Sequence, residues 1–329
     1  MQRRQFIIST ATAACAVGAL GQATAAESTV INYGGSAWLG HYPVYVGIKA
    51  GLFAAHGLEV KWTAFGTSSS RLSALLSGNI DMAGTGIVSA LALMSRGSKH
   101  FQIVGTPEDF GRVEGLFVRS DVTSVQSLKG KKIGVTFASS SHLLVLDLLA
   151  SAGLNPDKDV SLLNVPAPEL VAALQSKQID AAAVWTPHFN RIRAMPDTKL
   201  LADDTAFSLY KQFGVTPGPD VLVVRSEFAV KNSEAVRRFI QTYFSACAML
   251  RDKPVEMAKH LTELTNLTLD DQIATIKEAS WYDIGQQQSL LKAPGKFVDG
   301  VQKLADLLTA HKQIDKSPSV KDWINVSYL

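Results

Sequence analysis

Short apolar runs alternate with longer stretches of helical spacing along most of the chain. In the first third, residues 30–33, 58–62 and 81–84 are predicted strands, and each run ends in a loop of small or hydroxyl-bearing residues. A predicted helix follows each loop, and these helices cover residues 43–54, 70–77 and 87–94. This alternation is typical of βα units and of largely parallel sheets. We therefore expect the three loops at the C-terminal edge of one sheet, where open α/β folds bind ligands.

A second series of the same kind occupies the middle of the chain. Its predicted strands are 133–135, 160–165 and 181–185, and its predicted helices are 142–152 and 168–175. The loop that precedes the first of these helices is again rich in serine. The pattern predicts a second α/β unit with a sheet of its own.

Two similar apolar runs border this second unit. Residues 116–120 have the sequence Leu-Phe-Val-Arg-Ser, and residues 221–226 have the sequence Val-Leu-Val-Val-Arg-Ser. We interpret them as extended segments that link two lobes, one outbound and one returning; coincidence between two ordinary strands is the alternative. From residue 227 onward the pattern is helical, with polar loops near Lys253 and Gln286.

The first 26 residues have the pattern of a secretory signal peptide. Arg3 and Arg4 precede an apolar, Ala-rich run over residues 7–20, and small residues follow at 23–26. The apolar run is shorter than the roughly 20 residues that a membrane span needs. Arg-Arg-Gln-Phe also fits the twin-arginine pattern, so Tat and Sec export both stay open. Cys15 lacks the leucine that usually stands three residues before a lipidated cysteine, so we expect it to be removed with the signal and the mature chain to be periplasmic.

Size, charge and cysteine content narrow the class of protein. A mature chain of about 300 residues is too long for one ordinary core, so two lobes are expected. Removing Arg3 and Arg4 leaves 30 of the 32 basic residues against 29 acidic ones, a formal charge of +1. That balance gives no electrostatic reason to expect a nucleic acid or an anionic membrane as partner. Cys247 would be the only remaining cysteine, on a predicted buried helix face, so neither an internal disulfide nor a thiolate metal cluster is expected.

Motifs of the common enzyme classes are missing. The seven histidines show no H-x-H or H-E-x-x-H spacing, so no metal site is predicted. Ser141 and His142 are adjacent and point apart at a helix start, whereas a nucleophilic Ser–His pair needs side chains within hydrogen-bond reach. Neither a G-x-S-x-G elbow nor a Gly-rich phosphate motif is present. We expect a protein without cofactor, metal or catalytic activity.

The Ser/Thr/Gly loops favour the binding of a small anion. Free N–H groups and the helix dipole at the start of a helix attract negative charge. A tetrahedral sulfonate head can be held in this way without a lysine or an arginine. The alternative is that these side chains only cap their helices, which for any single loop is the more common case. The candidate residues in the four loops are Ser36, Ala37, Trp38, Gly66, Thr67, Ser68, Thr85, Gly86, Ser139, Ser140, Ser141 and His142.

Three further candidates stand beside predicted strands. Trp185, at a strand end, can offer a flat apolar face to a ligand, or it can be a core tryptophan. Asp220 follows Pro-Gly-Pro at the start of the returning segment and is a natural counter-charge for an ammonium group. Glu114 precedes the outbound segment in the same way. The alternative for both acids is a solvated loop position, which is common for carboxylates.

The chain resembles the solute-binding proteins of taurine, alkanesulfonate and nitrate importers. Residues 42–53, residues 56–60, Ser77-Gly78-Asn79-Ile80-Asp81 and residues 128–135 are similar to signatures of that family. The likeness extends over nearly the whole mature chain. It implies a type II periplasmic-binding-protein fold, in which two α/β lobes, each a mostly parallel sheet flanked by helices, are joined by two crossover segments.

Other motifs resemble the taurine branch of that family. Residues 137–142 are similar to its Phe-x-Ser-Thr-Thr-His loop, and Val184-Trp185-Thr186-Pro187 is similar to its Val-Trp-x-Pro strand end. Asp220 before a valine matches an aspartate that the family positions for the substrate amine, and residues 286–288 match a Gln-rich turn. Trp38 departs from the pattern, because the taurine receptors have an acid there. An aromatic side chain at this position is compatible with a larger or less polar ligand tail than aminoethyl.

The resemblance implies a receptor for a small sulfonate such as taurine. Lobe 1 is expected to comprise residues 28–116 and 222–329, and lobe 2 residues 117–221. A membrane permease and its ATPase are the expected partners of a monomeric receptor that closes on its ligand by a hinge motion. Nitrate, a thiamine-precursor pyrimidine and an aromatic sulfonate stay open as rival ligands. An enzyme on the same scaffold, such as a pyrimidine synthase, is the rival class, but its Cys-rich motif is missing here.

Overall fold

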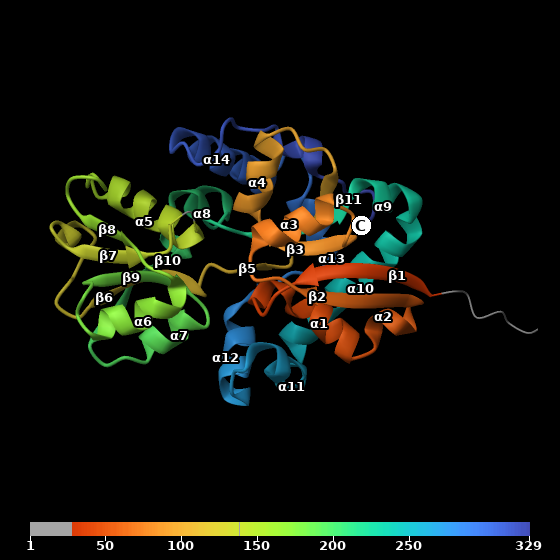
Figure 1. Cartoon of the computed structure of the whole chain (residues 1–329), viewed down its shortest axis with the longest axis horizontal. Helices are drawn as coiled ribbons and strands as arrows, with labels where there is room; N and C mark the ends of the chain where they lie inside the picture. The colour runs from red at the N-terminus through yellow and green to blue at the C-terminus, as the bar shows by residue number, and fades with distance from the viewer. Residues whose placement is uncertain (1–27, 138) are drawn as a thin grey trace, which may run out of the picture.

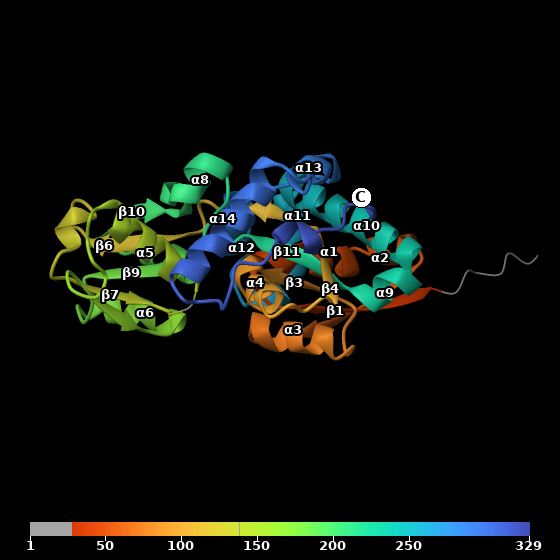
Figure 2. The same cartoon turned by 90° about the horizontal axis from the view of Figure 1, so that it is seen from above.

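The computed structural model describes residues 28–137 and 139–329. The predicted signal peptide and Cys15 lie outside the described residues. Two five-stranded sheets dominate the structure, and each is covered by helices. Figures 1 and 2 show them as two bodies side by side along the long axis of the molecule. The predicted two-lobed α/β fold is confirmed.

The first sheet has the strand order β2–β1–β3–β11–β4. β1 is parallel to β2 and β3, whereas β11 is antiparallel to both of its neighbours. The helices around this sheet come from both ends of the chain (Figure 1). The strands are β1 (Thr29–Gly35), β2 (Leu58–Ala64), β3 (Met82–Gly86), β4 (Phe101–Gly105) and β11 (Asp220–Arg225). The helices are α1 (Tyr42–Lys49), α2 (Leu52–Ala55), α3 (Ser68–Leu76), α4 (Ile87–Ser95), α9 (Ser226–Lys231), α10 (Ser233–Asp252), α11 (Pro254–Thr265), α12 (Leu269–Glu278), α13 (Ile284–Leu290) and α14 (Lys296–Ala310).

The second sheet has the strand order β10–β6–β9–β7–β8 and uses only the middle of the chain. β7 is parallel to β8 and β9, whereas β6 is antiparallel to both of its neighbours. Its strands are β6 (Glu114–Arg119), β7 (Lys132–Val135), β8 (Ser161–Asn164), β9 (Ala181–Trp185) and β10 (Thr198–Asp203). Its helices are α5 (Ser140–Ser151), α6 (Ala167–Gln175), α7 (His188–Arg193) and α8 (Ser208–Phe213), and the short turn η3 (Asp204–Ala206) follows β10.

The two similar Val-Arg-Ser runs form the antiparallel strand of each sheet. β6 is the first strand of the second sheet along the chain, and β11 is the first strand after the chain returns to the first sheet. The connections therefore lie just before these strands, over residues 106–113 and 204–219. The predicted lobe borders at 116/117 and 221/222 fall inside β6 and β11 and stay a proposal. In the structure β6 lies wholly in the second sheet and β11 wholly in the first.

Buried hydrogen bonds join the outbound connection to the rest of the first lobe. The Gln287 side chain pairs with both backbone groups of Thr106, at 2.9 Å to the N–H and 2.9 Å to the carbonyl oxygen. The Thr106 hydroxyl donates to the backbone carbonyl of Asp220 at 2.8 Å. Next to it, β5 (Glu108–Asp109) pairs with β12 (Ser280–Trp281). Gln286 and Gln287 belong to helix α13, so the polar loop predicted near Gln286 is a helix in the structure.

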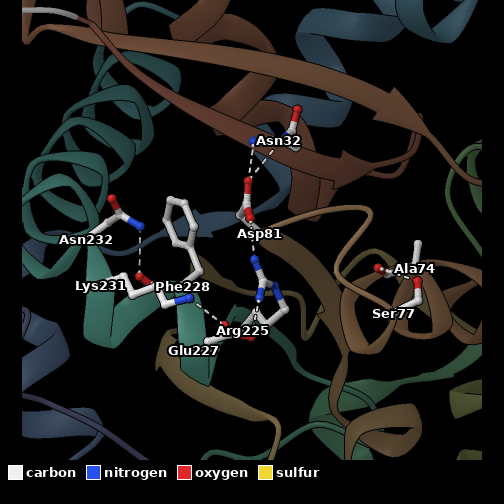
Figure 3. Close-up of polar contacts among 9 residues, drawn as sticks. All are labelled: Asn32, Ala74, Ser77, Asp81, Arg225, Glu227, Phe228, Lys231 and Asn232. Carbon is white, nitrogen blue, oxygen red and sulfur yellow. Dashed lines mark hydrogen bonds and ion pairs between the residues drawn. The ribbon is translucent and has the colours of Figure 1, made fainter.

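The Ser77–Asp81 signature has a structural role. Asp81 lies at the N-terminal end of β3, away from the C-terminal strand ends at which the helices begin. Asp81 accepts hydrogen bonds from the Asn32 backbone N–H and side-chain amide, each at 3.0 Å, and from the Arg225 guanidinium at 2.9 Å (Figure 3). Arg225 ends β11, and its backbone N–H donates to the Asp81 carbonyl. The network ties β1, β3 and β11 together, and it explains a family motif that carries no information about the ligand.

The apolar core continues between the lobes. α14 packs on α8, and Gly300 faces Phe213 and Val215 so closely that an added Cβ would come within 2.6 Å of both side chains. Cys247 is fully buried in a separate apolar cluster beneath α10, as predicted. No helix within residues 28–137 and 139–329 is both long and apolar enough to cross a membrane.

Candidate functional site

A cavity of about 380 Å³ lies where the C-terminal edges of the two sheets face each other. Its wall contains residues from the ends of β1, β3 and β9 and from both connections. The lining residues are Ser36, Trp38, His41, Gly66, Thr67, Ser68, Arg71, Gly86, Val88, Ser89, Phe110, Glu114, Ser139, Ser140, Trp185, Asp204, Gly218 and Asp220. This is the edge at which ligands bind in open α/β sheets.

Three helices begin at this cavity. Thr67 and Ser68 line it at the start of α3, Gly86 and Val88 at the start of α4, and Ser139 and Ser140 at the start of α5. The hydroxyls of Thr67 and Ser139 cap their own helices, since they accept from the backbone N–H groups of Ser70 and His142 at 3.1 and 3.2 Å. The capping alternative thus holds for these two side chains. The positive ends of three helix dipoles nevertheless point toward one space.

Arg71 adds a full positive charge to the wall. It stands in the first turn of α3 and is only 3% exposed. Its Nε donates to the Gly84 carbonyl at 2.5 Å and its Nη2 to the Ser68 hydroxyl at 3.1 Å. Burial lowers the pKa of Arg71, but a guanidinium stays protonated at neutral pH. Tertiary packing therefore brings into the cavity a guanidinium that was not among the candidate residues predicted from the sequence.

Asp220 interacts electrostatically with Arg71 and is 5% exposed. Its Oδ2 accepts from Trp38 Nε1 at 2.7 Å. Burial raises the pKa of Asp220 to about 7, while Arg71 and the Trp38 hydrogen bond act in the other direction. Asp220 thus already has a donor and a nearby cation within the protein.

His41 is fixed in one tautomer beside Asp220. The Ser36 backbone N–H donates to its Nδ1 at 2.9 Å, which leaves the ring proton on Nε2, 3.8 Å from Asp220 Oδ2. Burial lowers the pKa of His41 well below its usual value, so the ring is neutral. His41 therefore contributes a dipole rather than a charge.

Glu114, at the start of β6 in the second sheet, supplies a second carboxyl. The Ser140 hydroxyl donates to its two oxygens at 2.7 and 2.9 Å, and the Ser141 hydroxyl also donates to Oε1. Burial raises the pKa of Glu114, and these hydrogen bonds oppose that shift. Two serines that were expected to face an anion are therefore already engaged by an acid.

The cavity contains most of the predicted site residues and excludes four of them. Among the described residues, Ala37, Thr85, Ser141 and His142 do not line it. Ala37 is exposed, Thr85 is buried within β3 and Ser141 points to Glu114. The His142 ring stacks on Phe137, with ring centroids 4.6 Å apart, and borders a different cavity. Helix geometry explains the last two, because consecutive residues of α5 point in different directions.

Sequence reasoning missed Arg71, His41, Phe110 and Asp204. One local signal existed for Arg71, because a cation in the first turn of a helix opposes the dipole and therefore needs another reason to be there. Phe110 packs edge-on against Trp38 at 5.1 Å between ring centroids. Together with Trp185 these rings form the apolar part of the wall.

Comparison with known proteins places the chain in a family. Residues 24–265 match the NMT1-like family. The chain belongs to that family. It is 29% identical over 245 residues to the taurine-binding periplasmic protein of Escherichia coli, covering 72% of this chain and 74% of that protein.

Solved structures show the same fold for this NMT1-like protein. The periplasmic aliphatic sulphonate binding protein SsuA from Escherichia coli aligns with a TM-score of 0.77 at 20% identity, over 90% of this chain and 92% of SsuA. The desulfurization enzyme DSZB aligns with a TM-score of 0.67 at 15% identity, over 91% and 97% of the two chains. The predicted family and fold are confirmed. Binding proteins and an enzyme share this architecture, so function has to be argued from the site.

Proposed function

We propose that this chain is an extracytoplasmic receptor that captures a small sulfonate such as taurine between its two lobes and delivers it to an ABC importer. The observation that carries the proposal is the buried Arg71 among the starts of α3, α4 and α5. A buried guanidinium needs an anion or several acceptors, and three helix dipoles add to its positive potential. A carboxylate, nitrate or sulfonate could satisfy it, and the similarity to the taurine-binding protein favours the sulfonate.

The proposed contact residues divide by chemistry. Arg71 and the backbone N–H groups near Ser68, Gly86 and Ser140 would hold the oxygens of the sulfonate. Trp38, Phe110 and Trp185 would cover the carbon chain. Such a division, with a few convergent polar groups in an apolar wall, is typical of small-molecule sites.

The same proposal covers location and partners. The taurine-binding protein and SsuA are periplasmic proteins, and the predicted signal peptide is consistent with that compartment. We propose a monomer that presents its closed form to the permease of the importer, whose ATPase drives transport. Closure would couple ligand binding to recognition by shifting the population toward the closed form.

A thermal-shift experiment tests the ligand class. Ethanesulfonate should raise the melting temperature of the wild-type protein, whereas ethanol should not. A ligand at 100 times its Kd adds about 2.7 kcal/mol of stability. Arg71→Gln should abolish the response, with Arg96→Gln on the exposed end of α4 as the control. A response to a pyrimidine but to no sulfonate would overturn the proposal.

The enzyme alternative is tested by the fate of the ligand. The likeness to DSZB shows a shared fold alone. Cys247, the free cysteine of the described residues, is buried away from the cavity, and burial raises the pKa of its thiol. Mass spectrometry after prolonged incubation should recover the sulfonate unchanged, and released sulfite or sulfate would indicate an enzyme.

A further inference from the structure

Asp204 is the most deeply buried of the three carboxyls that line the cavity. It is 1% exposed, compared with 5% for Asp220 and 6% for Glu114. It begins η3, the turn that follows β10 in the second lobe, and Asp203 fixes this turn by accepting from the Thr205 N–H at 3.0 Å. Asp204 Oδ1 is buried and has no hydrogen-bond partner among the described residues.

The other two acids of the wall differ from Asp204 in this respect. Asp220 accepts from Trp38 and lies within the field of Arg71. Glu114 accepts from the hydroxyls of Ser140 and Ser141. Asp204 thus lines the cavity and has a buried oxygen without a partner, and a buried acceptor without a partner costs free energy until a donor reaches it.

Three other acids interact electrostatically with Asp204. Burial raises the pKa of Asp204, and Glu114, Asp203 and Asp109 raise it further. No cluster of His, Cys, Asp and Glu that could hold a metal ion is found in residues 28–137 and 139–329. A ligand that carries its own N–H donors and positive charge would satisfy the open oxygen and offset the repulsion among the acids.

We propose that Asp204 accepts a hydrogen bond from a positively charged nitrogen of the ligand and selects zwitterionic aminosulfonates over simple sulfonates. The anionic half of this ligand rests on the proposed function. The sequence favours Asp220 for this task, but Asp220 Oδ2 already accepts from Trp38 and its charge is already offset by Arg71. With Arg71 in the first lobe and Asp204 in the second, a zwitterion would bind both lobes at once, whereas a simple sulfonate would contact one charge.

Calorimetry with matched ligands tests the proposal. Taurine and ethanesulfonate have the same carbon chain and differ in the amine. Wild type should bind taurine more tightly, and Asp204→Asn should weaken taurine by about 100-fold or more, because an ammonium would be buried without its counter-charge. Ethanesulfonate should bind Asp204→Asn as well as it binds wild type. Glu108→Gln is the matched control, since Glu108 is equally buried but does not line the cavity.

Proton release provides a second measurement that needs no variant. An ammonium that binds Asp204 favours the ionised carboxylate, so taurine should release more protons than ethanesulfonate when heats are compared in buffers of different ionisation enthalpy. Equal proton release for the two ligands, or equal losses of both in Asp204→Asn, would overturn the role of Asp204. So would amine selectivity that vanishes in Asp220→Asn and persists in Asp204→Asn.

A carboxylate pair separates this inference from the proposed function. β-Alanine and propionate repeat the comparison without sulfur. Selectivity for β-alanine that depends on Asp204, in a protein that binds no sulfonate, would refute the sulfonate receptor and leave the role of Asp204 intact. Binding of ethanesulfonate as tight as that of taurine would refute the inference and leave the sulfonate receptor intact.

Discussion

Two opposing effects set the pKa of Asp220. Burial favours its neutral form, whereas nearby donors favour its charged form. The Trp38 indole and the Arg71 guanidinium lower its pKa, but desolvation outweighs them, and the result is a pKa of about 7. An unfolded aspartate titrates near 3.9. At the residue scale the cavity wall therefore gathers acids whose neutral forms are favoured, because burial raises the pKa of Asp204 and Glu114 as well.

This balance predicts a pH dependence of folding stability. Between about pH 4 and 7 the folded protein holds more protons at Asp220 than the unfolded chain does, so the free energy of unfolding falls as pH rises through this window. An asparagine side chain cannot titrate, so Asp220→Asn without ligand should gain stability relative to wild type as pH rises from 5 to 7. The gain should be at most about 3 kcal/mol, from ~1.4 kcal/mol per pH unit.

Urea denaturation of both proteins at several pH values measures this difference. Titrating groups that do not interact with Asp220 contribute equally to the two proteins and cancel in the comparison. A stability difference that stays constant from pH 5 to 7 would mean that Asp220 is ionised throughout the range.

At the scale of elements, side-chain hydrogen bonds hold the outbound connection to the first lobe, in addition to the short β5–β12 pairing. Gln287 on α13 pairs with both backbone groups of Thr106, and the Thr106 hydroxyl binds the Asp220 carbonyl. The outbound connection, α13 and the start of β11 are thus one hydrogen-bonded unit directly behind the cavity. All of these groups are buried, so water cannot replace a lost partner.

Gln287→Ala should therefore destabilise the fold. It leaves the buried N–H and carbonyl of Thr106 unsatisfied, and each such group costs about 1–3 kcal/mol. Gln288→Ala, one residue further along α13 and exposed, is the matched control and should change stability by less than about 0.5 kcal/mol. Chemical denaturation measures both, and equal effects of the two substitutions would show that the pairing with Thr106 contributes nothing.

At the scale of the whole molecule, the two lobes share more than two connecting segments. α14 belongs to the C-terminal part of the chain yet packs on α8, whose first residue is anchored to α5 by hydrogen bonds from Ser208 to Asp147 at 2.6 and 2.9 Å. Figure 2 shows α14 and α8 close together where the two bodies meet. Any closing motion has to move α14 and α8 together or slide one helix past the other. Small shifts between packed helices are one of the known modes of domain closure.

Small-angle X-ray scattering tests whether ligand closes the lobes. Saturating taurine should lower the radius of gyration of wild type, and Arg71→Gln should show no change under the same conditions, because the anion loses its counter-charge. An unchanged radius of gyration at an occupancy proven by calorimetry would contradict closure.

The sequence alone determined the fold, because the signals for it are local and repeated. Strand runs, helical periodicity and Ser/Thr/Gly loops recur along the chain. Each loop was predicted at the edge of a sheet, and residues of these loops line the cavity. Asp220, Glu114 and Trp185 could be predicted in the wall since they stand at strand ends, and strand ends share an edge. Their alternatives as solvated or core residues were excluded only by the structure.

Only the tertiary structure decided which polar groups are free to meet a ligand. Arg71 and His41 enter the wall because helices turn their side chains toward it, and a single helical position carries little signal of that in the sequence. Ser141 turned to Glu114, and Trp38 turned to Asp220, so groups that looked available were already paired. Asp204 was left with an open oxygen. Burial and hydrogen-bond satisfaction depend on many distant residues at once, and neither property is encoded in the residues next to a site.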